Sequence, residues 1–312
     1  MKSPQRLLAA LWAALVLPVS AAPLAYVPNE KSATVSVIDT ADDHVQGSFP
    51  VGQRPRGIAV GRQHLYLTDG KTGSLLIVDL QRGQRVRRVA VGDSPEGVSL
   101  SPDGRRLAVA VEDDNSVVLL SAPKARILAR IKVEGRNPEH AVFSPDGRWL
   151  YVSAEEAEQV DVIDVAARRQ LASIPVGKRP RGIGFLPDGR LAYVASELAD
   201  KVYAIDVARR EVIAEIATGA YPNGIAVHPD GSRVFVSNGR DGSVMAIDVA
   251  SQSVIARIEV GKRPWNMAIT PDGQKLYVAN GRSGTVSVID AANLKLLGEI
   301  PVGELPWGVS IR

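Results

Sequence analysis

The stretch Val302-Gly303-Glu304-Leu305-Pro306-Trp307-Gly308 has the pattern V-G-x-x-P-x-G, and it is the last of seven copies in the chain. The leading glycine of each copy recurs after 40 to 43 residues, at Gly52, Gly92, Gly135, Gly177, Gly219, Gly261 and Gly303. A fixed period of this length indicates a repeat architecture, in which each unit packs on its neighbours. The pattern therefore favours seven similar structural units over two unrelated domains.

Each repeat contains four short segments with the composition of β-strands. In the last complete repeat, Pro271-Asp272-Gly273 predicts a tight turn, because proline fixes φ and glycine accepts a positive φ. Around it lie runs rich in Val, Ile and Tyr, which predict strands at residues 266–270, 275–279, 285–290 and 296–302. Four antiparallel strands in a repeat of this size make one propeller blade. The sequence predicts an all-β, seven-bladed β-propeller.

The two ends of the chain contain complementary parts of one repeat. Ala25–Asn29 and Thr34–Asp39 match the second and third strands of the last complete repeat. Near the C-terminus, Gly308–Ile311 matches a first strand, which the N-terminal segment lacks. We therefore expect the C-terminal strand to pair with the N-terminal strands, which closes the ring and covers two sheet edges.

The N-terminus has the features of a secretory signal peptide. Basic residues and an uncharged apolar run, residues 7–17, precede small residues that end at Ala21. The run is shorter than the roughly 20 residues that span a bilayer. We expect residues 1–21 to be removed and residues 22–312 to form the propeller. The mature chain is then expected in the periplasm, as a monomer without a membrane span.

The composition excludes several kinds of chemistry. The chain has no cysteine, which excludes disulfides, thiol nucleophiles, thiolate metal sites and C-x-x-C-H haem attachment. The formal net charge is +3 and the leader carries two of the basic residues, so the mature chain is nearly neutral and nucleic-acid binding is disfavoured. Of four histidines, only His140 falls in a V-G-x-x-P-x-G segment. No metal site and no cofactor motif is predicted.

A candidate binding site follows from the geometry of a blade. The seven V-G-x-x-P-x-G connections and the loops after the second strands should share one face, opposite the Pro-Asp-Gly turns. The residues after the conserved prolines differ between repeats, and such variation on a shared scaffold is how propellers carry binding sites. The predicted ligand-binding residues are Arg56, Glu96, Glu139, His140, Arg181, Asn223, Trp265, Asn266 and Trp307.

The two tryptophans of this set allow two interpretations. Beside arginines, Trp265 and Trp307 can stack on a planar ligand. Alternatively, each Pro-Trp pair packs its loop onto the neighbouring blade. The third repeat is also irregular, with an extra residue, Glu134, and with His140 where most copies have glycine.

The second strands resemble a known repeat family. They read Tyr26-Val27-Pro28-Asn29, Tyr151-Val152-Ser153-Ala154 and Tyr277-Val278-Ala279-Asn280, which resembles the YVTN-repeat family of β-propellers over residues 25–312. Within that family the chain looks most like the periplasmic propellers associated with PQQ-dependent alcohol catabolism. The resemblance implies a role beside quinoprotein dehydrogenases, cytochromes or transport components, and it implies no particular biochemical activity.

Three functions remain open from the sequence. The first is a periplasmic binding or scaffold protein, accessory to PQQ-dependent alcohol oxidation, which takes a protein or a small ligand at the channel mouth. The second is an enzyme, either a lactonase-like hydrolase or a redox-partner subunit of a dehydrogenase. Its catalytic candidates are His140, Glu139 and Glu96, which can form an acid–base group. The third is nucleic-acid binding through loop arginines and tryptophans.

Overall fold

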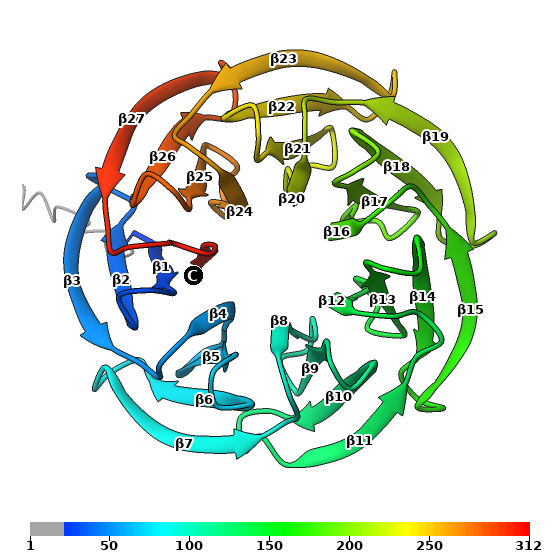
Figure 1. The fold of residues 1–312 in the computed structure, drawn as a ribbon. Coiled ribbons are helices and arrows are strands. Elements are labelled where there is room, and N and C mark those ends of the chain that lie inside the picture. The colour runs from blue at the N-terminus through cyan, green and yellow to red at the C-terminus, as the bar shows by residue number, and fades with distance from the viewer. Residues whose placement is uncertain (1–21) are drawn as a thin grey trace, which may run out of the picture.

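Seven antiparallel sheets of four strands each surround a central axis, as Figure 1 shows. This computed structural model describes residues 22–312, so the expected signal peptide lies outside the described residues. The predicted seven-bladed β-propeller is confirmed. Among residues 22–312 we find no helix with the length and apolar character needed to cross a membrane.

The blades are named A to G in chain order. Blade A contains β28 (Ser310–Ile311), β1 (Leu24–Asn29), β2 (Thr34–Asp39) and β3 (His44–Pro50). Blades B, C and D contain β4 (Pro55–Val60), β5 (His64–Asp69), β6 (Ser74–Asp79), β7 (Gln84–Ala90), β8 (Pro95–Leu100), β9 (Arg106–Val111), β10 (Ser116–Ser121), β11 (Ile127–Lys132), β12 (Pro138–Phe143), β13 (Trp149–Ala154), β14 (Gln159–Asp164) and β15 (Arg169–Pro175). Blades E, F and G contain β16 (Pro180–Phe185), β17 (Leu191–Ser196), β18 (Lys201–Asp206), β19 (Glu211–Ala217), β20 (Pro222–Val227), β21 (Arg233–Asn238), β22 (Ser243–Asp248), β23 (Ser253–Glu259), β24 (Pro264–Ile269), β25 (Lys275–Asn280), β26 (Thr285–Asp290) and β27 (Lys295–Pro301).

The hydrophobic core lies between adjacent blades. The second and third strands are buried on both faces, and the outermost strands are largely exposed. Leu65 and Leu76 of blade B, for example, pack with Tyr26 and Val35 of blade A. Because each apolar sheet face is covered only by the next blade, the ring must close for every face to be buried.

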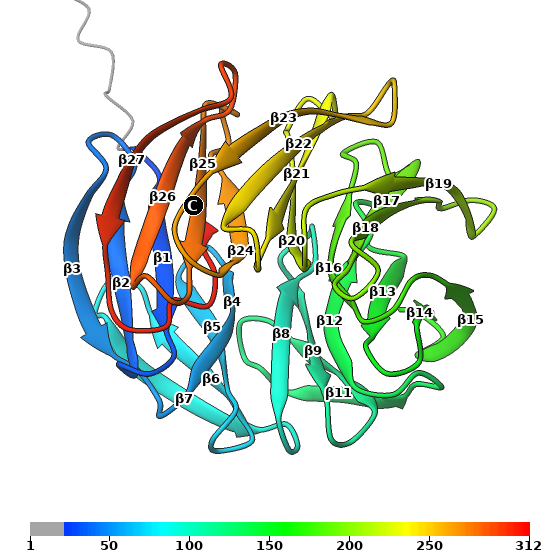
Figure 2. The same cartoon turned by 45° about the horizontal axis from the view of Figure 1, so that its top comes forward.

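The ring closes as predicted, within blade A. The C-terminal β28 pairs antiparallel with β1, with Tyr26 opposite Ser310. Leu24 and Arg312 exchange backbone hydrogen bonds of 2.7 and 3.0 Å, and Asn29 forms a bridge with Pro306. Figures 1 and 2 show the chain leaving β27 and returning to the axis beside β1.

The innermost strands begin earlier than the sequence suggests. The prediction placed a strand start at Asn266, whereas β24 begins at Pro264 and its register with β25 shifts between Pro264 and Met267. Proline can occupy this place because β24 is an edge strand, so the missing N–H leaves no ladder bond unmade.

The V-G-x-x-P-x-G connections and the loops after the second strands do share one face. The Gly70 amide donates to the Arg54 carbonyl at 3.1 Å, and the Gln53 amide donates to the Asp69 carboxylate at 3.0 Å. We call this face the mouth.

Candidate functional site

Glycines on the innermost strands allow the blades to approach the axis closely. A Cβ added at Gly57 would lie 2.3 Å from the Glu96 carbonyl oxygen of the next blade. A Cβ at Gly97 would lie 2.6 Å from Nδ1 of His140. The irregular residue His140 therefore lies against a glycine of blade C and projects towards the axis.

Two small cavities lie on the axis. The mouth cavity, of about 120 Å³, is lined by Glu30, Arg56, Glu139, Arg181, Asn223, Arg263, Trp265, Asn266 and Trp307. A second cavity of about 120 Å³ lies along the innermost strands and is lined by Gly57, Ile58, Gly97, Val98, His140, Asn266, Trp307, Gly308 and Val309. The structure thus brings eight of the nine predicted residues to these cavities, and the ninth, Glu96, pairs with Arg56.

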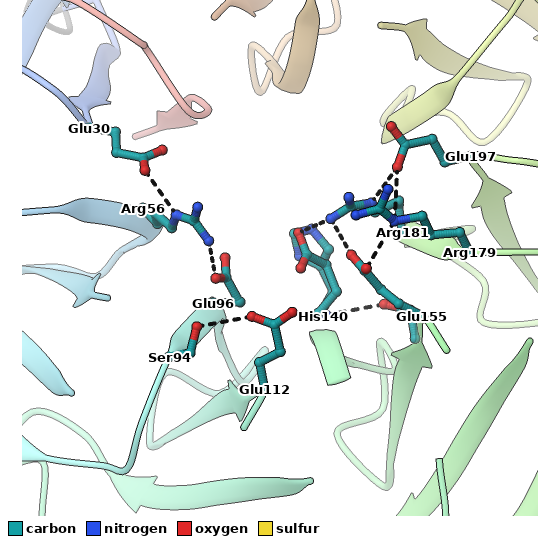
Figure 3. Close-up of polar contacts among 12 residues, drawn as sticks. Glu30, Arg56, Ser94, Glu96, Glu112, His140, Glu155, Arg179, Arg181 and Glu197 are labelled. Atoms are coloured by element: carbon teal, nitrogen blue, oxygen red, sulfur yellow. Dashed lines mark hydrogen bonds and ion pairs between the residues drawn. The ribbon is translucent and has the colours of Figure 1, made fainter. Parts of the chain in front are cut away.

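Ion pairs at the mouth form two groups, as Figure 3 shows. In the first group, Arg56 donates a hydrogen bond from Nη1 to Glu96 and forms an ion pair with Glu30, 3.3 Å from its Nε. Arg54 contacts the same Glu30 oxygen at 2.6 Å. The Glu96 side chain is 1% exposed, and its Oε2 has no hydrogen-bond partner within residues 22–312.

The second group is centred on Arg181, which contacts three carboxylates. Its Nη1 lies 2.8 Å from Glu139 and also pairs with Glu155, while its Nε lies 2.9 Å from Glu197. Arg263 of blade G reaches Glu197 at 2.8 Å. A buried guanidinium held by several carboxylates has a fixed position and retains its charge.

The sequence prediction missed four carboxylates of the mouth. Glu30, Glu112, Glu155 and Glu197 each follow directly after a second strand, and the corresponding residue is glycine in the other three blades, at Gly70, Gly239 and Gly281. The repeat itself carries the signal that could have found them, because this position is glutamate in four blades and glycine in three. Glu112 accepts a 3.0 Å hydrogen bond from Ser94.

Burial raises the pKa of two carboxyl groups at the mouth, those of Glu96 and Glu155. Burial, together with the charge of Glu139, raises the pKa of Glu96 to about 9 despite its pairing with Arg56. The same two causes raise the pKa of Glu155 to about 7. Glu96 is therefore protonated at neutral pH, and a protonated carboxyl can donate a hydrogen bond as well as accept one.

The pKa values of Glu139 and His140 are instead lowered. Burial opposes the charge of Glu139, but Arg181, His140 and Arg56 outweigh burial and hold its pKa below the ordinary value. Burial also lowers the pKa of His140, so its imidazole is neutral at pH 7. The Nε2 of His140 is buried and has no hydrogen-bond partner among the described residues.

The two tryptophans have different surroundings. A Cβ at Gly281 would lie 2.6 Å from the Trp265 ring, so Trp265 packs on the loop after β25 of its own blade while it also lines the mouth cavity. Trp307 is 8% exposed, and its ring centroid lies 5.6 Å from that of His140. The Trp265 ring therefore packs within its own blade rather than on a neighbouring one, and Trp307 lies beside His140 of blade D. Both rings form cavity wall, and stacking on a planar ligand stays a prediction.

The arrangement can recognise a small polar molecule. It combines fixed guanidinium groups, a protonated carboxyl, the amides of Asn223 and Asn266, and two indole rings. Within residues 22–312, no three His, Cys, Asp or Glu side chains are arranged to hold a metal ion.

Comparison with known proteins places the chain in a family. Residues 19–172 and 166–303 match the family described as "Lactonase, 7-bladed beta-propeller". The chain belongs to this lactonase family. No curated protein sequence matches the chain significantly.

Two solved structures illustrate the range of proteins that share this fold. The structure titled "Kuenenia stuttgartiensis Hydrazine Synthase" is 23% identical, covers 86% of this chain and 92% of its own, and has a TM-score of 0.78. A functionally unknown protein from Desulfotomaculum acetoxidans DSM 771 is 17% identical, covers 92% of this chain and 98% of its own, and has a TM-score of 0.81. At these identities the likeness concerns the fold alone.

Proposed function

We propose that this lactonase-family propeller is a binding protein that takes a small polar ligand at its mouth. The observation that carries the proposal is the mouth cavity, where Arg56, Arg181, Trp265 and Trp307 converge from four blades. The cavity is small, about 120 Å³, and charged and amide side chains line it together with two indole rings, which suits a small polar ligand. The arginines are held in place before a ligand arrives, so little side-chain entropy is lost on binding.

We also propose that the protein acts in the periplasm, as an accessory to alcohol oxidation. The signal-peptide pattern in residues 1–21 and the resemblance to propellers of PQQ-dependent alcohol catabolism support a periplasmic accessory role. The ligand classes to test first are therefore quinones and the aldehydes and carboxylates that alcohol oxidation produces. A protein partner such as a quinoprotein dehydrogenase or a cytochrome would be recruited beside the same face.

Intrinsic fluorescence provides a direct test. Residues 22–312 contain Trp149, Trp265 and Trp307, and Trp149 begins β13 on the face opposite the mouth, 4.5 Å from the Arg148 guanidinium. A ligand at the mouth is expected to change the emission of Trp265 and Trp307 and leave that of Trp149 unchanged.

The variants for this test are Trp265→Phe and the matched control Trp149→Phe. Titration with each ligand class should give a saturable fluorescence change that Trp265→Phe reduces and Trp149→Phe preserves. If no member of these classes changes the emission or the melting temperature, the mouth does not bind the proposed ligands. If the change survives in Trp265→Phe and disappears in Trp149→Phe, the ligand binds elsewhere.

A second candidate function is lactone hydrolysis. It is favoured by the family match and by His140, whose buried, neutral imidazole has an unpartnered Nε2 on the second cavity. A neutral imidazole can accept a proton from an attacking water, and Arg181 can stabilise negative charge on the lactone oxygen.

Hydrolysis of small lactones can be followed by proton release. The enzyme proposal requires His140→Ala to abolish turnover. The matched control is His228→Ala, because His228 lies on the opposite face, beside Gly273. This change should leave the rate unchanged. An equal rate in His140→Ala and the parent protein removes this candidate.

A further inference from the structure

Charge is distributed unevenly around the mouth. In blades C, D and E the loops after the second strands, residues 112–115, 155–158 and 197–200, contain three, three and two acidic residues and no basic one. In the other four blades, each corresponding loop contains one basic residue: Lys31, Lys71, Arg240 and Arg282. Figure 1 shows that blades C and D lie across the ring from blades F and G.

A wide groove lies on the basic side, between blades F and G. It has a volume of about 660 Å³ and is lined by Tyr221, Gly239, Arg240, Asp241, Gly242, Glu259, Val260, Gly261, Lys262, Arg263 and Arg282. The Arg263 side chain lies against Gly239, where an added Cβ would be 3.4 Å from it. The volume falls within the range of small-molecule sites, roughly 300–1,000 Å³.

The cations of the groove are largely uncompensated. Among residues 22–312, the side chains of Arg240, Lys262 and Arg282 form neither an ion pair nor a hydrogen bond. The two acidic residues of the groove, Asp241 and Glu259, both pair with Arg257, at 3.2 and 2.8 Å. The groove therefore retains an excess of positive charge.

Tyr221 holds two of the guanidinium groups in place. The carbon atoms of the Arg240 and Arg263 guanidiniums lie 5.5 and 5.7 Å from the centroid of its ring. Tyr221 itself has a φ of 59°, and its amide donates to the Asp200 carboxylate at 2.9 Å. Its position is thus fixed by the backbone, and the cation–π contacts hold Arg240 and Arg263 against its ring, while Arg263 also pairs with Glu197.

We propose that this groove is an anion-binding site for small molecules that carry two or more negative charges on phosphate or carboxylate groups. Arginine and lysine bind these oxygens through charge-assisted hydrogen bonds, and three of the donors are unoccupied. The acidic loops of blades C, D and E repel an anion from the other half of the mouth. Because Arg263 lines both the groove and the mouth cavity, the anion sits next to the first site.

The test is isothermal titration calorimetry of residues 22–312 with pyrophosphate and with citrate. The two probes distinguish phosphate from carboxylate as the preferred group. The variants are Lys262→Gln and Arg282→Gln, each of which removes one unpaired cation from the groove. Lys71→Gln is the matched control, because Lys71 is in the same loop position as Arg240 and Arg282 but in blade B.

We expect at least one probe to bind and each groove variant to weaken binding about ten-fold, the loss of one charge-assisted hydrogen bond. Lys71→Gln should leave binding unchanged. The proposal is overturned if neither probe binds, or if Lys71→Gln weakens binding as much as Lys262→Gln does. All of these changes are on exposed side chains, and thermal unfolding checks that each variant is folded. The result is separate from the mouth ligand, whose readout is tryptophan emission.

Discussion

The closing strand offers the sharpest test of how this propeller is held together. Besides the β28–β1 ladder, deletion of residues 303–312 removes five backbone hydrogen bonds to the N-terminal segment: two between Leu24 and Arg312, and those of the Glu30, Lys31 and Trp307 amides. At about 1 kcal/mol each, these amount to about 5 kcal/mol.

The same deletion also removes two apolar side chains that are buried in the closed ring and uncovers the apolar side chains that they contact. Trp307 and Val309 are 8% and 7% exposed in the closed ring. Burial of an aromatic and an aliphatic side chain of this kind contributes roughly another 5 kcal/mol. The sum, about 10 kcal/mol, is comparable to the whole unfolding free energy of a typical domain, about 5–15 kcal/mol. We therefore expect the truncated chain to lose cooperative unfolding and to associate through the open edge of β1.

The assay is urea unfolding followed by circular dichroism, with light scattering to detect association. A circular permutant is the matched control: a short linker joins residues 22 and 312, and new ends are placed in the exposed turn at Gly189. It keeps every closing contact and should unfold near the midpoint of the parent protein. If the truncated chain unfolds at that same midpoint and stays monomeric, the closing strand does not stabilise the ring.

Two further predictions concern the mouth. Burial raises the pKa of Glu96 to about 9 from 4.5, so the folded protein holds a proton that the unfolded chain releases, and stability should fall as pH rises between these values, by up to about 1.4 kcal/mol per pH unit. Glu96→Gln should reduce this dependence in urea unfolding at pH 5 to 8, leaving the part that Glu155 contributes below about pH 7, and an unchanged slope would contradict the assigned protonation. Gly97→Ala should destabilise the protein by about 1–3 kcal/mol, because its Cβ would meet His140 at 2.6 Å and the Glu139 carbonyl at 2.9 Å. Gly47→Ala, where nothing lies within 4 Å, is the control, and equal effects of the two changes would show that contact at the axis is not the cause.

Much of the mouth could be anticipated because the repeat makes position predictable. Once the blades are aligned, every residue after a conserved proline must face the axis, and this placed Arg56, Arg181 and Trp307 correctly. The same reasoning, applied to the residue after each second strand, would have located Glu155 and Glu197. The loops after the second strands carry no conserved proline, so the sequence pattern that identifies the mouth does not single out their first residue.

The pairing of those side chains could not be derived from the repeat. Arg181 and Arg263 come from different blades and share Glu197, and such contacts depend on the distance between blades and on the rotamers chosen. The raised pKa of Glu96 follows from complete burial beside Glu139, which is a property of the packed ring.

The sequence alone determined the number of blades, the closure of the ring and the face that bears the mouth. These follow from local patterns, since strand alternation, tight turns and a constant period are encoded over a few residues and then repeated. Tertiary structure decided which charges meet, which carboxyl keeps its proton, and that the cations of blades F and G border an open groove. Those properties depend on burial and on distances between residues far apart in the chain, because electrostatic energies change steeply with both.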